Sequence, residues 1–317
     1  MRPRGESFLS WVLTHGDCDG VCSGAIALAA RWPSKIVFTK PSTLLDDLIG
    51  LRDIERIIIC DIALPETKAR DILATLQELS SKHELLYIDH HPLPFNFDMP
   101  GFFVHSLNAC ASELTYRAFQ VQLPKDMSRV AIYGAIGDYA DDSEFMQLII
   151  SYWDKRMLYF ESGLLSQGLD YIRRDYRSKR RILESLAMNL LPSSDAELAG
   201  AAIEESRLEE RMRKEVTVKV RTLGKIAYVL NIEGSIGKAA IYARAVTGLQ
   251  IGIAGEEERG YVDMSLRSVR EGLDLDRILR RLAPSFGGTG GGHPKAAGAS
   301  IPVESFQLFV KALDELT

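Results

Sequence analysis

The stretch SFLSWVLTHGDCDGVCSGAIALAARW, residues 7–32, contains the first predicted strand and the first predicted helix. It begins with SFLSWVL, an apolar run typical of a buried strand, and ends with GVCSGAIALAARW, which has the spacing of a helix. His15, Asp17 and Asp19 are crowded into the turn between the two. Like-charged carboxylates repel, and such crowding is tolerable at a surface turn or beside a cation. The stretch therefore predicts a strand and a helix joined by an acidic turn.

Strands and helices alternate through the rest of the first half of the chain. Further buried strands are predicted at KIVF (35–38), RIIICDI (56–62) and ELLYID (84–89). Helical spacing lies between them at residues 42–50 and 65–83, with Pro65 in the first turn of the latter. This alternation is typical of an α/β fold in which an open parallel sheet has helices on both faces.

The second half of the chain is organised differently. Residues 160–214 look helical and highly charged, and LPSSD at 191–195 is the clearest break and an expected N-cap. Strands are then predicted at VTVKVRTL (216–223), KIAYVLNI (225–232), LQIGIAGE (249–256), YVDMSLRS (261–268) and AAGASIP (296–302). We therefore expect an N-terminal α/β domain at 1–180, a helical linker at 181–215, and a smaller α/β domain with a mixed sheet at 216–317.

Composition limits the class of protein. The chain has 317 residues, a net charge of −5 and four cysteines. Its length favours two domains, and its charge argues against a uniformly basic DNA-coating surface, so nucleic-acid contact would be confined to a groove. Four cysteines in a chain of this size do not form a disulfide framework. No apolar run is long enough to cross a bilayer and MRPRGESFLSWVL lacks a small-residue cleavage pattern, so we expect a cytoplasmic protein with no membrane partner.

Acids and histidines gather where the predicted strands end. They are His15, Asp17 and Asp19 after the first strand, Asp61 after RIIIC, and Asp89, His90 and His91 at the end of ELLYI. Because the carboxyl ends of neighbouring parallel strands form one crevice, these segments can converge, and Asp138 in GAIGDYA could join them from a helix end. Four of the six histidines lie in THGD, IDHHP and GGGHPK, a concentration that indicates a site.

The residue types in this set indicate a metal site. Carboxylates and imidazoles without paired thiolates suit Mn²⁺ or Mg²⁺ rather than structural zinc. One carboxylate shared by two such ions, about 3.5–4 Å apart, would make a two-metal site that generates a hydroxide and stabilises a displaced phosphoryl group. For single residues a structural alternative stays open, with Asp17 and Asp19 as turn residues and Asp89 as a helix cap. Cys18 is either a metal contact or a compact apolar neighbour.

With HGDCDG, CDIAL, IDHHP, GAIGDY and GGGHPKAAG in this order, the chain resembles the DHH phosphoesterase superfamily. The closest branch is similar to RecJ-like and nanoRNase enzymes that carry a DHH-associated C-terminal domain. The resemblance covers residues 15–298 and implies a catalytic domain at 1–180 and a substrate-binding domain at 216–317. It also implies hydrolysis of phosphoesters with two divalent ions, Mn²⁺ being preferred and Mg²⁺ possible, in a cleft between the two domains.

The resemblance implies a role for each residue of the N-terminal motifs. Six would be metal ligands, namely His15, Asp17, Asp19, Asp61, His90 and Asp138. Among these, His15 and Asp17 would hold one ion, Asp19 would hold the other, and Asp61 would bridge the two. His91 and Asp89 would be catalytic. His91 would face the scissile phosphate, and Asp89 would orient the histidines, as a carboxylate beside a metal-bound imidazole does.

The same resemblance implies substrate-binding residues in the second domain. They are Ser265 and Arg267 in SLRS, and Gly290, Gly291, Gly292, His293 and Lys295 in the glycine-rich loop GGTGGGHPKAAG. Glycines let backbone N–H groups approach an anion, while Arg267 can bind a phosphate in bidentate fashion. A plain turn and a rim arginine in a surface ion pair are the structural alternatives.

The substrate is less well defined than the chemistry. The preferred interpretation is a RecJ-like exonuclease or oligonucleotidase on single-stranded DNA or RNA, in which a metal-activated hydroxide attacks the phosphate. Alternatives are a nanoRNase or 3′-phosphoadenosine 5′-phosphate phosphatase, another small-nucleotide phosphoesterase, and a non-catalytic replication-associated binding protein of the same fold. A homodimer or a replication or repair partner is also possible. The basic run RRDYRSKRR (173–181) either guides a single strand or is the solvated face of a linker helix.

Overall fold

The computed structural model describes residues 10–94 and 97–317. The chain divides into two compact units between Glu205 and Ser206, inside a single helix. Residues 1–9 lie outside the described residues. They include the first three residues of the strand expected at 7–13 and most of the segment MRPRGESFLSWVL, which lacks a cleavage pattern. Among the residues described, no helix combines the length and the apolar character needed to span a bilayer.

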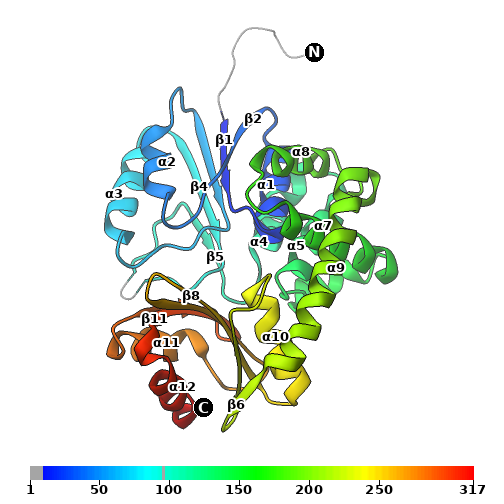
Figure 1. The fold of residues 1–317 in the computed structure, drawn as a ribbon. Helices are drawn as coiled ribbons and strands as arrows, with labels where there is room; N and C mark the ends of the chain where they lie inside the picture. The colour runs from blue at the N-terminus through cyan, green and yellow to red at the C-terminus, as the bar shows by residue number, and fades with distance from the viewer. Residues whose placement is uncertain (1–9, 95–96) are drawn as a thin grey trace, which may run out of the picture. The chain divides into compact units, whose positions relative to one another are not determined.

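The N-terminal unit is built on a five-stranded sheet (Figure 1). Its strands are β1 (Ser10–Thr14), β2 (Ser34–Phe38), β3 (Arg56–Cys60), β4 (Glu84–Asp89) and β5 (Phe103–His105). All neighbouring strands are parallel, in the order β2-β1-β3-β4-β5. The prediction of an open parallel sheet is therefore confirmed.

Helices cover both faces of this sheet. They are α1 (Cys18–Ala30), α2 (Leu44–Gly50), α3 (Ala69–Ser80), α4 (Ala111–Phe119), α5 (Ser128–Gly137), α6 (Glu144–Ile150), α7 (Lys155–Ile172) and α8 (Tyr176–Ala187), with 3-10 turns η1 (Gln120–Gln122), η2 (Lys125–Met127) and η3 (Pro192–Ser194). Alternate strand residues face opposite sides, so Leu13 packs with α2 and α3 whereas Val12 packs with α1, α4 and α5. Figure 1 shows α2 and α3 on one side of the sheet and α1, α4 and α5 on the other.

The strand order indicates where a ligand would bind, at the carboxyl ends of the strands beside β1. β1 lies between β2 and β3, so the chain leaves β1 in one direction for β2 and later returns to the other side for β3. In open α/β sheets, ligands bind outside the carboxyl ends of the strands where the order reverses in this way. The turns that follow β1, β2, β3 and β4 therefore lie along one edge of the sheet.

The C-terminal unit contains a six-stranded mixed sheet. Its strands are β6 (Arg221–Leu223), β7 (Ile226–Leu230), β8 (Ile251–Glu258), β9 (Tyr261–Ser268), β10 (Thr289–Gly292) and β11 (Ala296–Pro302). Their order is β10-β11-β9-β8-β7-β6, and β7 and β8 are the parallel pair. The mixed sheet expected in this half is confirmed.

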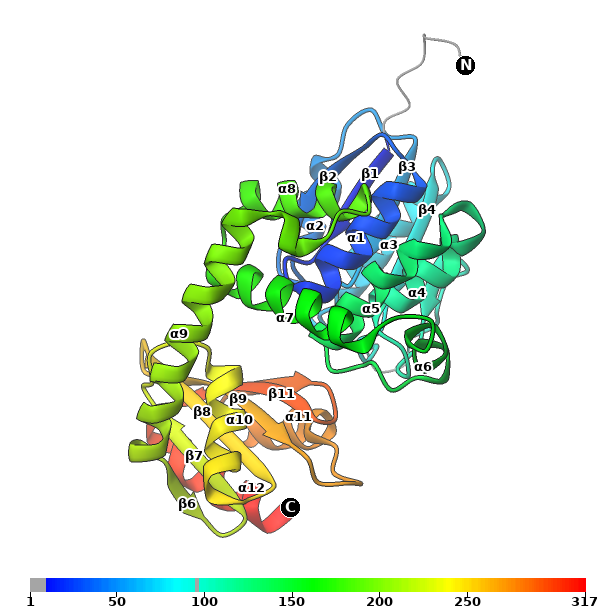
Figure 2. The ribbon, with the colours of Figure 1, turned by 90° about the vertical axis from the view of Figure 1, so that its right-hand side faces the viewer.

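The helices of the C-terminal unit lie on both faces of its sheet. They are the second half of α9 (Ala196–Lys219), α10 (Ile236–Thr247), α11 (Leu275–Ser285) and α12 (Phe306–Leu316), with the 3-10 turn η4 (Val303–Ser305). Met212 and Val216 of α9 pack with the alanines of α10 on one face, and α11 and α12 cover the other. Figure 2 shows α10 beside the end of α9.

The structure corrects the sequence prediction at three places. The strand predicted at 216–223 is wrong, because α9 continues to Lys219 and only Arg221–Leu223 is a strand. Met212 and Val216 are four residues apart on the buried face of that helix, and Glu215 pairs with Lys219 at 2.5 Å. Part of the glycine-rich loop is strand β10, and Pro65 lies in the turn before α3 rather than in the helix.

Candidate metal centre

The turn after β1 is fixed by Asp17. This residue is the N-cap of α1, and its Oδ1 accepts a hydrogen bond from the Gly20 amide at 3.0 Å. Its other oxygen lies 2.8 Å from Nδ1 of His15, and the Asp17 charge raises the pKa of that histidine. A side chain at Gly20 would come within 2.5 Å of the His15 carbonyl oxygen, so a glycine is required there. The HGDCDG motif is therefore a preformed pair of polar groups at the start of a helix.

Asp19 is a buried carboxylate that also anchors a second helix. Its Oδ2 accepts the Ala111 amide at 2.8 Å, and its Oδ1 accepts the Ser112 amide at 2.9 Å. These are the first two residues of α4, whose N-terminal amides and dipole favour a negative charge. Asp19 therefore stays next to the strand ends because a helix start binds both of its oxygens.

Asp61 follows β3 in a conformation unusual for a residue other than glycine. Its φ is +59°, and only 3% of its surface is exposed. Within the described part of the chain, Oδ2 of Asp61 is buried without a hydrogen-bond partner. Burial, followed by the charges of Asp17 and Asp19, raises the pKa of the Asp61 carboxyl well above its ordinary value. A buried anion of this kind requires a compensating positive charge.

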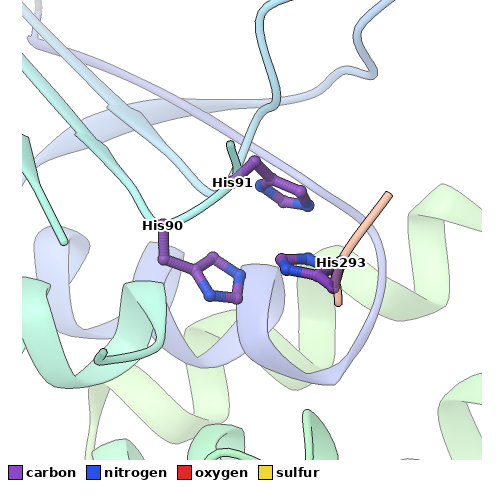
Figure 3. Close-up of side chains that lie close together, drawn as sticks. All are labelled: His90, His91 and His293. Carbon is purple, nitrogen blue, oxygen red and sulfur yellow. The ribbon is translucent and has the colours of Figure 1, made fainter. Parts of the chain in front are cut away.

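His90 lies among three carboxylates at the end of β4. Its Nε2 is 3.4 Å from Oδ1 of Asp61, 3.6 Å from Oδ2 of Asp138 and 3.8 Å from Oδ2 of Asp19. Asp138 reaches this position because α5 ends at Gly137. Burial lowers the pKa of His90, which favours the neutral ring that binds metals. Figure 3 shows the imidazoles of His90 and His91 after the strand. Their ring centroids are 4.7 Å apart.

His91 contacts Asp89 of strand β4 and His105 of strand β5. Its Nδ1 is 2.8 Å from Oδ1 of Asp89, and its backbone amide donates to Oδ2 of the same aspartate at 3.2 Å. Nε2 of His105 is 2.7 Å from the His91 carbonyl oxygen. Burial lowers the pKa of His91, but Asp89 outweighs this effect through its charge and hydrogen bond, so the pKa is raised. His105 was not predicted, because its position depends on the pairing of β5 with β4, which puts it opposite Asp89 and which the sequence pattern does not show.

The donor atoms form groups that could hold cations. His15, Asp17 and Asp61 make one group, and Asp19, His90 and Asp138 make another, each with ligand atoms within 4.8 Å of one another. Asp61 faces both, because its Oδ2 is 3.9 Å from Nδ1 of His15 while its Oδ1 is near His90. Asp89 and His91 form a third group with Asp61. Oxygen and imidazole donors around an unpartnered buried carboxylate oxygen fit divalent ions such as Mn²⁺ or Mg²⁺.

Replacing Asp19 by alanine should destabilise the metal-free protein by about 2–4 kcal/mol, because two buried amides of α4 lose a charged acceptor. Asp17→Ala should cost only about 1 kcal/mol, the typical loss for an exposed N-cap. Urea unfolding in a chelator measures both. Asp19→Asn, which keeps one acceptor oxygen, should fall between them, and equal losses for Asp17→Ala and Asp19→Ala would contradict the anchoring role.

The predicted substrate residues come together at one end of the sheet of the C-terminal unit. Arg267 lies opposite Ala296 in the pairing of β9 with β11, and its Nη1 donates to Oγ of Ser265 at 2.7 Å. Gly290, Gly291 and Gly292 lie on β10, and His293 and Lys295 form the tight turn to β11. The His293 amide closes this turn on the Ala296 carbonyl at 2.8 Å. All seven residues thus lie on the adjoining strands β9, β10 and β11 or in the turn between the last two.

Asp276 is a further residue of this corner that the sequence did not reveal. Its Oδ1 accepts the Gly292 amide at 2.7 Å, and Nε of Arg280 donates to both of its oxygens at 2.8 and 3.0 Å. A side chain at Gly291 would lie 3.1 Å from Asp276. The available signal was the Asp276 and Arg280 pair four residues apart on a short helix. This pair fixes the end of the glycine-rich strand.

Sequence comparisons identify the C-terminal part of the chain. Residues 231–317 match the sequence model of the DHHA1 domain. The chain is also 35% identical over 105 residues to the uncharacterized protein MJ0831 of Methanocaldococcus jannaschii, a match covering 32% of this chain and 23% of that protein. The chain therefore corresponds to less than two thirds of that relative.

Comparisons of structure cover nearly the whole chain. RecJ of Thermus thermophilus in complex with Mn²⁺ matches with a TM-score of 0.66 and 18% identity, over 97% of this chain and 52% of RecJ. PF0399, the DHH domain of a member of the s1p family of ribosomal proteins, matches with a TM-score of 0.75 and 15% identity. The match covers 97% of this chain and 86% of PF0399. PggH of Vibrio cholerae, a pGpG-specific phosphodiesterase, matches with a TM-score of 0.57 and 14% identity, over 98% of both chains.

These structural likenesses establish the fold, and this chain spans about half of the RecJ chain. Residues 231–317 are therefore a DHHA1 domain, and 97% of the chain has the fold seen in RecJ.

Proposed function

We propose that this protein is a two-metal phosphodiesterase that acts as an exonuclease or oligonucleotidase on single-stranded DNA or RNA. The observation that carries the proposal is the position of Asp61. One of its oxygens faces His15 and the other faces His90, so a single carboxylate lies between two groups of ligand atoms. A carboxylate shared in this way is the core of a two-metal site for phosphoryl chemistry.

Six side chains would hold the ions, in two groups with one shared member. His15, Asp17 and Asp61 form one group, and Asp19, His90 and Asp138 form the other. Asp61 would also join the second group, because its Oδ1 lies 3.4 Å from Nε2 of His90. Divalent ions bound there would supply positive charge to the phosphodiester and lower the pKa of the attacking water. The protein orients the ligands through the N-cap of α1 and the amide pair at the start of α4.

His91 would act on the substrate rather than hold an ion. Asp89 binds its Nδ1, which fixes the tautomer and favours the protonated ring, so His91 would act through Nε2. A cationic imidazole could neutralise a phosphate oxygen or protonate the leaving oxygen. Asp89 would thereby position His91.

Two further observations bear on the substrate. The match to RecJ, an exonuclease, supports a nucleic-acid substrate. The match to PggH, a pGpG-specific phosphodiesterase, extends over 98% of both chains and supports a short oligonucleotide or dinucleotide. A non-catalytic binding protein of this fold is disfavoured because the six residues proposed as ligands lie in two groups whose donor atoms are within 4.8 Å of one another. Single-stranded nucleic acid, long or short, is therefore the proposed partner.

The test is incubation with Mn²⁺ and an oligonucleotide ladder labelled at either end, from dinucleotide to 20-mer. We expect metal-dependent cleavage that EDTA abolishes. The carboxylates of the site are negative, so without the ions they would repel the phosphate. Products of the two labels will give the polarity. Cleavage of dinucleotides alone would establish the small-nucleotide alternative, and absence of hydrolysis of any phosphoester would refute the proposed enzyme.

A further inference from the structure

A basic pocket adjoins the metal centre on the β2 side of the N-terminal unit. It has a volume of about 250 Å³ and lies at the carboxyl ends of β1 and β2, against the corner between α7 and α8. His15, Gly16 and Asp17 form one wall, so the pocket and the first group of metal ligands share two residues. Lys40, Arg173, Tyr176 and Lys179 also line the pocket.

The charge of the basic pocket favours an anion. Lys40, Arg173 and Lys179 bring three cations, against the carboxylates of Asp17 and Asp170. Asp17 is already paired with His15. Lys179 is only 6% exposed and its ammonium group donates to the Gly16 carbonyl, so one cation is built into the wall rather than placed on a flexible surface side chain. The acidic ligand groups therefore follow β1, β3 and β4, whereas the basic pocket lies beside the ends of β1 and β2.

Tyr176 gives the same pocket an aromatic surface. Its ring stacks on Phe38 at the end of β2, with centroids 5.5 Å apart and planes 22° apart, while 45% of the residue stays exposed. A Cβ at Gly16 would lie 3.5 Å from both the Tyr176 ring and the Lys179 ammonium. A fixed ring beside a positive charge is the combination that binds the bases and phosphates of single strands.

The backbone also favours a binding role for this wall. Arg173 follows α7 with a φ of +52°, where glycine or asparagine would fit more easily. An arginine kept in such a conformation beside a pocket is typical of a functional position. Arg181, in the same basic run, is used differently, since it pairs with Asp195 at 2.5 Å and with Glu197 at 2.7 Å. The run RRDYRSKRR therefore divides into a pocket wall and a structural arginine.

We propose that the basic pocket binds the nucleotide adjacent to the cleaved phosphodiester, with its phosphate on Lys40, Arg173 and Lys179 and its base on Tyr176. This inference rests on the proposed function and narrows it, because it gives the site a preference for oligonucleotides over phosphodiesters that carry one phosphate. The pocket is small for a ligand site, which fits one nucleotide unit rather than a folded strand. Its shared wall with His15 and Asp17 places that unit next to the ions.

The experiment compares two substrates in Mn²⁺, a thymidylate trinucleotide and bis(p-nitrophenyl) phosphate, which has one phosphate and no base. For Arg173→Gln and Tyr176→Leu, we expect KM for the trinucleotide to rise by about tenfold or more with kcat within twofold. Hydrolysis of bis(p-nitrophenyl) phosphate should be unchanged. Arg180→Gln is the matched control, because Arg180 is an exposed arginine of the same run that does not line the pocket, and both of its activities should equal those of the wild type.

A binding measurement separates this inference from the proposed function. Thymidine 3′,5′-bisphosphate, titrated calorimetrically into the metal-free protein, should bind the wild type and Arg180→Gln alike and Arg173→Gln at least about tenfold more weakly. If the wild type hydrolyses no phosphoester but this binding pattern holds, the function fails while the pocket stands. Equal kinetic losses on both substrates, or unchanged bisphosphate binding and trinucleotide KM in both variants, would overturn the pocket assignment.

Discussion

Replacing Asp61 by asparagine should lower metal-dependent phosphodiester hydrolysis by about 10³-fold or more. The loss should exceed the roughly 10–100-fold that removal of an outer hydrogen-bond partner costs, because Asp61 would contact both ions. Asparagine is the appropriate substitution, since it tolerates the left-handed φ of +59° better than alanine and has the same shape as aspartate. Steady-state kinetics with the trinucleotide in Mn²⁺ measures the effect.

The same variant should change stability in a way that activity does not report. At 100-fold excess over its Kd, one bound ion adds about 2.7 kcal/mol, or roughly 5–10 °C in Tm for a unit of this size. Asp61→Asn should lose most of this gain. Near-normal kcat, or an unchanged Tm gain with Mn²⁺, would remove Asp61 from the metal site.

The pH dependence of the metal-free protein follows from the same carboxyl. Burial raises the pKa of Asp61 above its unfolded value of about 3.9, so ionisation of this group destabilises the folded state. Its contribution to stability is fully present below pH about 4 and is lost as pH rises through the folded pKa. In a chelator, the stability difference between Asp61→Asn and wild type should therefore grow with pH in favour of the variant. Urea unfolding at several pH values between about 4 and 8 measures this difference.

Replacing His91 by glutamine should lower kcat by about 10²- to 10⁴-fold, the usual contribution of a general acid or base. Unlike Asp61→Asn, this variant should keep the Tm gain with Mn²⁺, because His91 pairs with Asp89 and would face the substrate. The pH profile adds a second measurement. A protonated imidazole that acts on the substrate loses activity as pH rises through its pKa, which Asp89 keeps above the ordinary value.

Asp89→Asn serves as the matched control for this assignment. It leaves the His91 ring in place but removes the charge that raises its pKa, so the alkaline limb of the kcat profile should move to lower pH. A loss of the Mn²⁺-dependent Tm gain in His91→Gln would instead show that His91 is a metal ligand, as the group of Asp61, Asp89 and His91 permits.

The N-terminal fold could be predicted because its strands are buried on both faces. RIIIC and ELLYID read as continuous apolar runs between helical segments, and both are central strands of the parallel sheet. The stretch VTVKV could not be read correctly from its own pattern. Its β-branched residues favour a strand, but Val216 and Met212 share a helix face that packs on the alanines of α10, and only the tertiary structure supplies those contacts.

The candidate site was predictable in its membership but not in its supports. Strand ends locate His15, Asp61 and His90, because parallel strands share an edge. Asp19 accepts a hydrogen bond from the start of α4, 92 residues further along the chain. No local sequence pattern predicts such a contact. The glycine-rich segment was likewise expected to be a loop, because its strand character depends on pairing with β11.

The central position of β1 affects how the protein folds. β1 pairs with β2 and β3, and β3 pairs with β4, so the side chains of Asp17, Asp61 and Asp89 stay far apart until strands from separate parts of the chain have docked. We expect pairings of this kind to form late in folding, because the long loops between the strands must close first. Repulsion that arises after the transition state accelerates unfolding and leaves the folding rate almost unchanged. We therefore expect the clustered carboxylates to make the metal-free protein unfold faster. Bound cations would slow this unfolding.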